Sequence, residues 1–306
     1  MSTPATIPVR RTEFRGAGDI VLAADAFGNP DDSSIILLPG GGQTRFAWRR
    51  SAEMFAQNGY YALSFDLRGH GQSGWAGNGD YSIDAFAADV VCIARQVPAG
   101  SVFVGASIGG IAALIAAGEC PARLARALVL VDVVPRMSEA SLDRIRAFMS
   151  AGADGFASPE EAAALVRAYL PHRPPRSALA LRHNLRTGDG GRLYWHWDPA
   201  FHAGSRQRAE SGMLRRMEAA TRGVDVPVLL VCGERSEVVD EQAVAHLMQL
   251  LPNAKSVRVG GAGHMVAGDR NDAFAATVLD FLGELSRPGM PSQSTGGRLL
   301  PTDQES

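Results

Sequence analysis

The fold of this chain is decided by residues 101–110, which read SVFVGASIGG. The apolar residues 102–104 predict a buried parallel strand, and the small apolar residues 111–117 predict a helix packed on the sheet. Between them lies a Gly-x-Ser-x-Gly motif centred on Ser107. A sharp turn from strand to helix would hold Ser107 in a strained conformation with its hydroxyl pointing out of the sheet. The motif therefore predicts a nucleophilic serine, and its alternative is a glycine-rich turn without chemistry.

Strands and helices alternate on both sides of this motif. Buried strands rich in Val, Ile and Leu are predicted at residues 34–38, 60–65, 127–132, 226–232 and 255–259. Helical stretches lie between most of them. This alternation predicts an α/β fold in which a mostly parallel sheet carries helices on both faces.

The alternation divides the chain into a core and an insertion. Residues 1–134 and 224–286 form the predicted core, and residues 135–223 (the inserted segment) interrupt it. Four helices and no clear strand are predicted in the inserted segment, at 138–149, 158–170, 177–185 and 206–221. Residues 287–306 are rich in Pro, Gly, Ser and Gln without an apolar period, which predicts a disordered tail.

Composition excludes several classes of function. The chain has 306 residues and a net charge of −2, so no basic surplus indicates nucleic acid or an anionic membrane as a partner. Its three cysteines show no metal or redox spacing, and no phosphate-binding glycine motif follows the first strand, so we expect neither metal nor cofactor. No signal or membrane-spanning stretch is evident, which favours a cytoplasmic protein. The sequence does not fix the oligomeric state, and a homodimer is compatible with it.

A serine nucleophile needs a base within hydrogen-bond reach and an acid that holds the base. His264 follows the last predicted strand in a glycine-rich loop, so we predict it as the base rather than as a surface or core histidine. Two carboxylates are candidates for the acid that holds His264. We favour Glu237, after the strand that ends at 232, over Asp132, which ends the preceding strand. Glu237 could instead be an exposed acid, and Asp132 could cap nearby amides.

The oxyanion formed during acyl transfer requires backbone donors. The amide of Ile108 lies at the start of the helix after Ser107, and Gly41 lies in the glycine run 40–42. We predict these two amides as the oxyanion hole. Gly40 gives the run backbone freedom beside the substrate, and Gln43 is predicted to contact it.

Aromatic residues concentrate in the inserted segment. Tyr194, Trp195 and Trp197 lie close together there. They predict an apolar surface that binds a hydrophobic or cyclic substrate, and the alternative is plain packing of the insertion on the core. A second cluster, formed by Asp66, Arg68 and His70 at a strand end, is interpreted as mainly structural.

Taken together, these residues resemble the α/β-hydrolase superfamily over roughly residues 12–286. The resemblance rests on motifs in the family's order, namely residues 37–44 (LLPGGGQT), 66–71 (DLRGHG), 105–110 (GASIGG), 233–239 (GERSEVV) and 263–264 (GH). It implies that the inserted segment, 135–223, is a helical cap that shapes the substrate pocket. Pro39 stands where the family often has His, and Glu237 where it usually has Asp. Ser107 replaces the Asp nucleophile of epoxide hydrolases and haloalkane dehalogenases, which argues against both chemistries.

The resemblance implies a serine esterase or lactonase without a cofactor, acting on a hydrophobic small molecule. Two alternatives stay open. One is a non-hydrolytic, cofactor-free relative of the lyase or dioxygenase type, in which His264 pairs with Asp132. The other is a ligand-binding receptor on the same scaffold, which an intact Ser, acid and His set makes less favoured.

Overall fold

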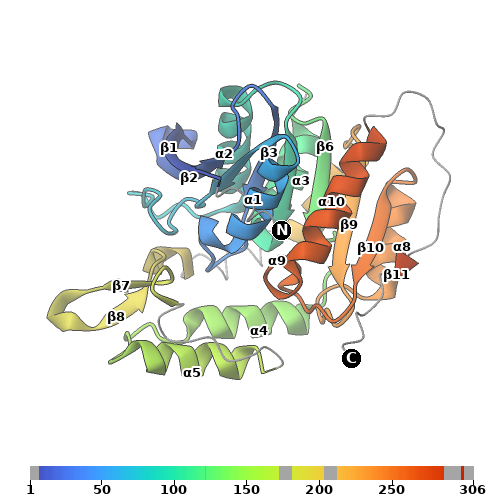
Figure 1. The fold of residues 1–306 in the computed structure, drawn as a ribbon. Helices are drawn as coiled ribbons and strands as arrows, with labels where there is room; N and C mark the ends of the chain where they lie inside the picture. Colours follow the sequence, from blue (N-terminus) through green and yellow to red (C-terminus); the bar gives the residue numbers. More distant parts are fainter. Residues whose placement is uncertain (1–6, 121, 172–180, 203–211, 286–297, 300–306) are drawn as a thin grey trace, which may run out of the picture.

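The computed structural model describes residues 7–120, 122–171, 181–202, 212–285 and 298–299. Within these residues nine strands form one sheet, in the order β1-β2-β4-β3-β5-β6-β9-β10-β11 (Figure 1). β2 pairs antiparallel with β1 and with β4, and the remaining neighbours are parallel. The predicted α/β class is confirmed. The strands are β1 (Val9–Arg15), β2 (Val21–Phe27), β3 (Ser33–Leu38), β4 (Tyr60–Phe65), β5 (Val102–Ala106), β6 (Ala127–Val131), β9 (Val228–Gly233), β10 (Lys255–Val259) and β11 (Arg298–Leu299).

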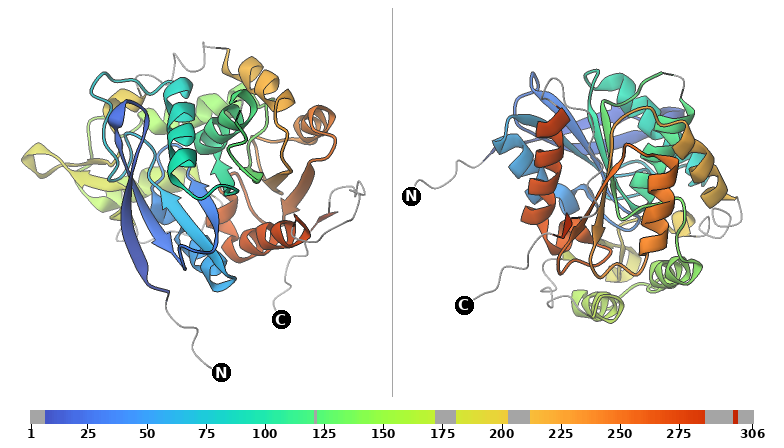
Figure 2. Two further views of the ribbon diagram at one scale, coloured as in Figure 1. Left: turned by 90° about the horizontal axis from the view of Figure 1, so that it is seen from above. Right: turned by 90° about the vertical axis from the view of Figure 1, so that its right-hand side faces the viewer.

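Helices cover both faces of this sheet (Figure 2). In β3, the side chains of Ile35 and Leu37 pack toward one face and those of Ile36 and Leu38 toward the other, because successive residues of a strand point to opposite sides. The first face is covered by α1 (Arg49–Gln57) and α10 (Asn271–Leu285). The second is covered by α2 (Ile83–Gln96), α3 (Ser107–Glu119), α7 (Met213–Arg222) and α8 (Glu241–Leu250).

Most of the described part of the inserted segment lies together below the sheet in Figure 1. This part contains α4 (Glu139–Ser150), α5 (Pro159–Tyr169) and an antiparallel hairpin of β7 (Leu185–Thr187) and β8 (Leu193–Trp195). The expectation of helices alone is therefore wrong. The last helix of the segment, α7, packs instead against α3 of the core. The hairpin turn, η4 (Asp189–Gly191), has positive φ at Gly190 and Gly191, a conformation that glycine adopts without strain. Parts of the helices predicted at 177–185 and 206–221 lie outside the described residues.

The remaining described elements are short. They are η1 (Ala17–Asp19), η2 (Arg45–Trp48) and α9 (Val266–Asp269). The predicted disordered tail, 287–306, lies outside the described residues except for Arg298–Leu299, which pair with β10 as β11. Within the part of the chain described, no helix combines the length and the apolar character that crossing a bilayer requires.

Candidate active site

Ser107 sits at the turn between β5 and α3, where the motif placed it. It is the first residue of α3 and has φ of +46°, which is strained for a residue with a side chain. The neighbouring glycines make the turn sterically feasible. A Cβ at Gly105 would lie 2.5 Å from the Gly110 Cα, and one at Gly109 would lie 2.5 Å from the Pro39 carbonyl oxygen. The motif therefore specifies a tight turn at the edge of the sheet.

The glycine run after β3 lies against this turn. A Cβ at Gly40 would be 3.2 Å from the Cβ of Ser107. The Gly40 amide donates to Gln43 Oε1 at 3.0 Å, and the Gly42 amide donates to His70 Nε2 at 3.0 Å. Between them, the Gly41 amide makes no hydrogen bond to any residue in the described ranges.

Ile108 brings a second backbone amide to the same place. It is the second residue of α3, so its N–H is one of the four at a helix start that lack an acceptor within the helix. A Cβ at Gly41 would lie 3.8 Å from the Ile108 Cγ2. The two predicted oxyanion donors, Gly41 and Ile108, therefore belong to segments in contact beside Ser107.

His264 is held by Asp132. Its Nδ1 lies 2.6 Å from Asp132 Oδ2, and the carboxylate side chain is fully buried. A carboxylate only accepts hydrogen bonds, so Nδ1 carries the proton and Nε2 is left as the basic nitrogen. Ser236 Oγ donates to the same carboxylate oxygen at 2.6 Å. No hydrogen bond joins Ser107 Oγ to His264 within the described residues, and such catalytic bonds commonly tighten only when substrate binds.

Glu237 does not contact His264, so the preference for it over Asp132 is corrected. Its side chain is 57% exposed and forms an ion pair with Arg144 of α4. Ser236, one residue earlier, turns toward Asp132, while its hydroxyl also accepts from the amides of Val238 and Val239. This turn directs the next side chain, that of Glu237, to the surface. Sequence reasoning missed Ser236. The signal that could have found it is its place in the loop directly before Glu-Val-Val, because a serine hydroxyl in a turn commonly bonds to nearby backbone groups.

Two cavities reach both Ser107 and His264. One, of about 170 Å³, has mostly apolar walls that include Ile145, Phe148, Met149, Val166, Leu181, Trp195 and Trp197. The other, of about 530 Å³, has more polar walls that include Arg49, Arg50, Glu53, Arg182 and Asn271. They share the walls formed by Gly40, Gln43, Ser107, Asn184, His264 and Met265. The structure thus brings Ser107 and His264, far apart in sequence, to one site.

The predicted substrate-binding residues separate into two groups. Gly40 and Gln43 line both cavities, and the stacked rings of Trp195 and Trp197, 5.0 Å apart, line the apolar one. Tyr194 is among the walls of neither of these two cavities, and its prediction as a substrate contact is corrected. It precedes Trp195 on β8 and so faces the opposite side of the hairpin, where its ring lies 5.1 Å from the Arg186 guanidinium.

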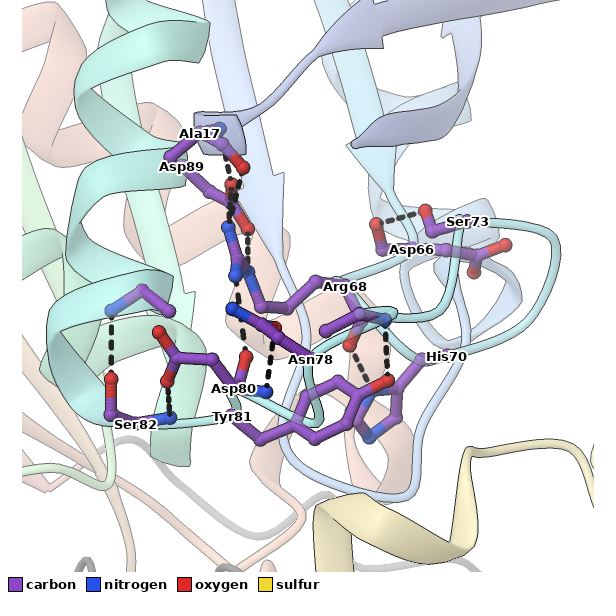
Figure 3. A network of polar contacts seen from close by, with 12 residues as sticks. Ala17, Asp66, Arg68, His70, Ser73, Asn78, Asp80, Tyr81, Ser82 and Asp89 are labelled. Carbon is purple, nitrogen blue, oxygen red and sulfur yellow. Dashed lines mark hydrogen bonds and ion pairs between the residues drawn. The ribbon is translucent and has the colours of Figure 1, made fainter. Parts of the chain in front are cut away.

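The polar cluster after β4 holds loops together, in agreement with its structural interpretation. Arg68 pairs with Asp89 of α2 (Figure 3), and its Nε and Nη2 each donate to the carboxylate at 2.6 Å. Asp89 also accepts from the Ala17 amide at 2.8 Å. Asp66 pairs at 2.5 Å with Arg45, which is buried too. These buried pairs fix the loop that carries His70 beside the glycine run.

His196, which sequence reasoning missed, predicts how stability depends on pH. Burial lowers its pKa from 6.5 to about 4, while an unfolded chain keeps the ordinary value. Between these values the unfolded state binds a proton that the folded state does not, so stability falls on acidification from about pH 6.5 to pH 4. We expect this residue to contribute a loss of about 2 kcal/mol between pH 7 and pH 4.5.

Urea unfolding at the two pH values measures this loss. The control is His196→Gln, which removes the titrating group and is expected to show a shallower dependence on pH. Equal slopes for the two proteins would contradict the assignment to His196.

Comparison with known proteins places this site in a family. The sequence profile of the Alpha/beta hydrolase family matches residues 35–277, and the chain belongs to this family. The chain is 31% identical over 256 residues to the esterase Rv0045c of Mycobacterium tuberculosis, covering 81% of this chain and 82% of that protein. It is 32% identical over 229 residues to the 2-(acetamidomethylene)succinate hydrolase of Mesorhizobium japonicum, covering 73% and 78%.

A solved structure agrees with the sequence relatives. A structure of the M. tuberculosis esterase Rv0045c superposes with a TM-score of 0.73 at 28% identity, covering 92% of this chain and 93% of that chain. The relatives are named as hydrolases, and this chain is a hydrolase of the same family.

Proposed function

We propose that this hydrolase cleaves a carboxylic ester or lactone of a hydrophobic small molecule through an acyl-enzyme, with Ser107, His264 and Asp132 as its triad. The observation that carries the proposal is the buried Asp132–His264 hydrogen bond of 2.6 Å beside the strained Ser107, with both His264 and Ser107 lining the same cavities. The name of one relative, an esterase, supports the ester class.

The first half of the reaction forms the acyl-enzyme. Ser107 Oγ attacks the carbonyl carbon while His264 Nε2 takes the hydroxyl proton, and Asp132 stabilises the imidazolium that results. The carbonyl oxygen becomes an oxyanion, which accepts hydrogen bonds from the amides of Gly41 and Ile108. When the tetrahedral intermediate collapses, the bond to the alkoxide breaks and His264 returns the proton to that leaving oxygen.

The second half regenerates the enzyme. Water attacks the acyl carbon and gives its proton to His264, and collapse of the second intermediate returns that proton to Ser107 Oγ and releases the acid. For a lactone, acid and alcohol leave as one molecule. The apolar cavity fits a hydrophobic acyl chain or ring, and its walls come largely from α4, α5 and β8. We therefore propose that the inserted segment acts as a cap over the substrate.

A fluorophosphonate probe tests this proposal together with a panel of acyl esters and lactones. The serine oxygen displaces fluoride from the phosphorus of the probe and becomes phosphonylated, so we expect label on the peptide that contains Ser107. We also expect turnover of esters with apolar acyl groups. Ser107→Ala is the matched control and is expected to lose both. Labelling without turnover on the whole panel would favour the lyase or oxygenase alternative. Tight retention of an unchanged compound would favour a receptor.

A further inference from the structure

Gly42 belongs to the glycine run 40–42, here called the oxyanion loop. Histidine rings hold both of its backbone polar groups. Its N–H donates to His70 Nε2 at 3.0 Å, and its carbonyl oxygen lies 3.2 Å from His196 Nε2. Gly42 has φ of +74°, so it adopts a conformation that most residues avoid. The two rings fix the peptides that directly follow Gly41.

The hydrogen bonds define the tautomer of each ring. Because the Gly42 amide donates to His70 Nε2, the proton of His70 is on Nδ1, which lies 2.9 Å from the Arg68 carbonyl oxygen. In His196 the arrangement is reversed. The Gly71 amide donates to Nδ1 at 2.8 Å, so the proton is on Nε2 and is donated to the Gly42 carbonyl. Both rings are buried and act as neutral groups.

The two rings come from different parts of the chain. His70 belongs to the core loop after β4, and His196 follows β8 in the inserted segment. Further contacts tie the inserted segment to that loop: the Asp198 amide donates to the Gly69 carbonyl at 2.8 Å, and the Phe201 ring meets the His70 ring edge-on with centroids 4.6 Å apart. The inserted segment is thereby attached to the oxyanion loop itself.

This attachment bears directly on Gly41. On one side the Gly40 amide is held by Gln43, and on the other the Gly42 peptides are held by the histidines, so the Gly41 amide is fixed between two anchored groups. A donor orients an oxyanion best when its direction is set before reaction. We propose that His196 is a positioning residue through which the inserted segment orients the Gly41 amide toward the oxyanion. The inference rests on the proposed acyl chemistry.

Two substitutions separate the hydrogen bonds of His196. In His196→Asn, Oδ1 lies as many bonds from Cα as Nδ1 does, so it can still accept from Gly71, but the shorter side chain cannot reach the Gly42 carbonyl. In His196→Gln, the amide nitrogen reaches as far as Nε2 and can donate to Gly42. The Gln variant thus keeps the bond on which the proposal depends, and the Asn variant loses it.

The measurement compares two inhibitors of the same alkyl chain. A trifluoromethyl ketone adds to Ser107 Oγ and forms an oxyanion while the serine proton passes to His264. The corresponding methyl ketone binds without forming this adduct. For His196→Asn we expect kcat and trifluoromethyl ketone affinity to fall together by about tenfold to a hundredfold, with KM and methyl ketone affinity changed less than about threefold. His196→Gln is expected to recover most of the loss.

Several results would overturn the inference. The first is an unchanged affinity for the trifluoromethyl ketone in folded His196→Asn. The second is an equal loss of affinity for both ketones in this variant, which would indicate that His196 has a purely structural role. If His196→Asn does not fold, the decision falls to His196→Gln, whose selective loss of more than about tenfold in trifluoromethyl ketone affinity would also overturn it. Absence of an adduct at Ser107 in the unaltered protein would instead refute the proposed acyl chemistry.

Discussion

Replacing Ser107 with alanine is expected to lower kcat/KM for a hydrolysed ester by about 10⁴-fold or more, because no acyl-enzyme can form without the hydroxyl. Alanine keeps the Cβ at this strained position, with its φ of +46°, so the turn between β5 and α3 should persist. The measurement is steady-state hydrolysis of the best ester in the panel, with thermal unfolding as the test of folding.

Binding of the methyl ketone provides the control for Ser107→Ala, since it does not need the hydroxyl and should change little. Activity within about tenfold of the unaltered protein would show that another group makes the attack, and covalent catalysis at Ser107 would be refuted.

Replacing Asp132 with asparagine is expected to lower kcat by about 10³-fold to 10⁴-fold. The amide is nearly the same size as the carboxylate, but it carries no charge to stabilise the imidazolium, and its NH₂ group favours the wrong tautomer of His264. Asp132 is fully buried and its bond to His264 is 2.6 Å, so water cannot readily substitute for it. The measurement is kcat and KM across pH 5 to pH 9.

Glu237→Gln is the matched control for Asp132→Asn, since it makes the same chemical change on the other acid that the sequence proposed. Glu237 pairs with Arg144 at the surface, and exposed ion pairs contribute little to stability, so kcat should stay within about twofold. A larger loss in Glu237→Gln than in Asp132→Asn would reverse the assignment of the acid.

The turn at Ser107, between β5 and α3, could be predicted because its steric requirements are local. Glycines at 105 and 109 are needed because backbone atoms lie 2.5 Å from the positions that a Cβ would occupy there, and this need is visible in five residues of sequence. The parallel sheet was likewise evident from buried apolar runs. Both depend on short-range sterics and burial, which a single sequence records well.

The acid could not be chosen from sequence because Asp132 and Glu237 both follow strands that end at the same edge of the sheet. Which one meets His264 depends on the path of the 233–239 loop, and that path is set by the Ser236 hydroxyl bonding to Asp132. The prediction of Tyr194 as a substrate contact was wrong for a related reason. The hairpin register, not the aromatic composition, decides which of Tyr194 and Trp195 faces the cavity.

The presence of two cavities beside Ser107 has a consequence for how the substrate selectivity of the protein can change. Apart from the residues at their junction, the two cavities have separate walls, one built largely on α4 and α5 and the other partly on α1. If the acyl group of the proposed ester occupies the apolar cavity and the leaving group occupies the other, substitutions in one set of walls would alter the acceptable acyl group, and substitutions in the other set would alter the leaving group. Evolution or protein engineering could then retune each half of a substrate independently while the reacting atoms keep their surroundings.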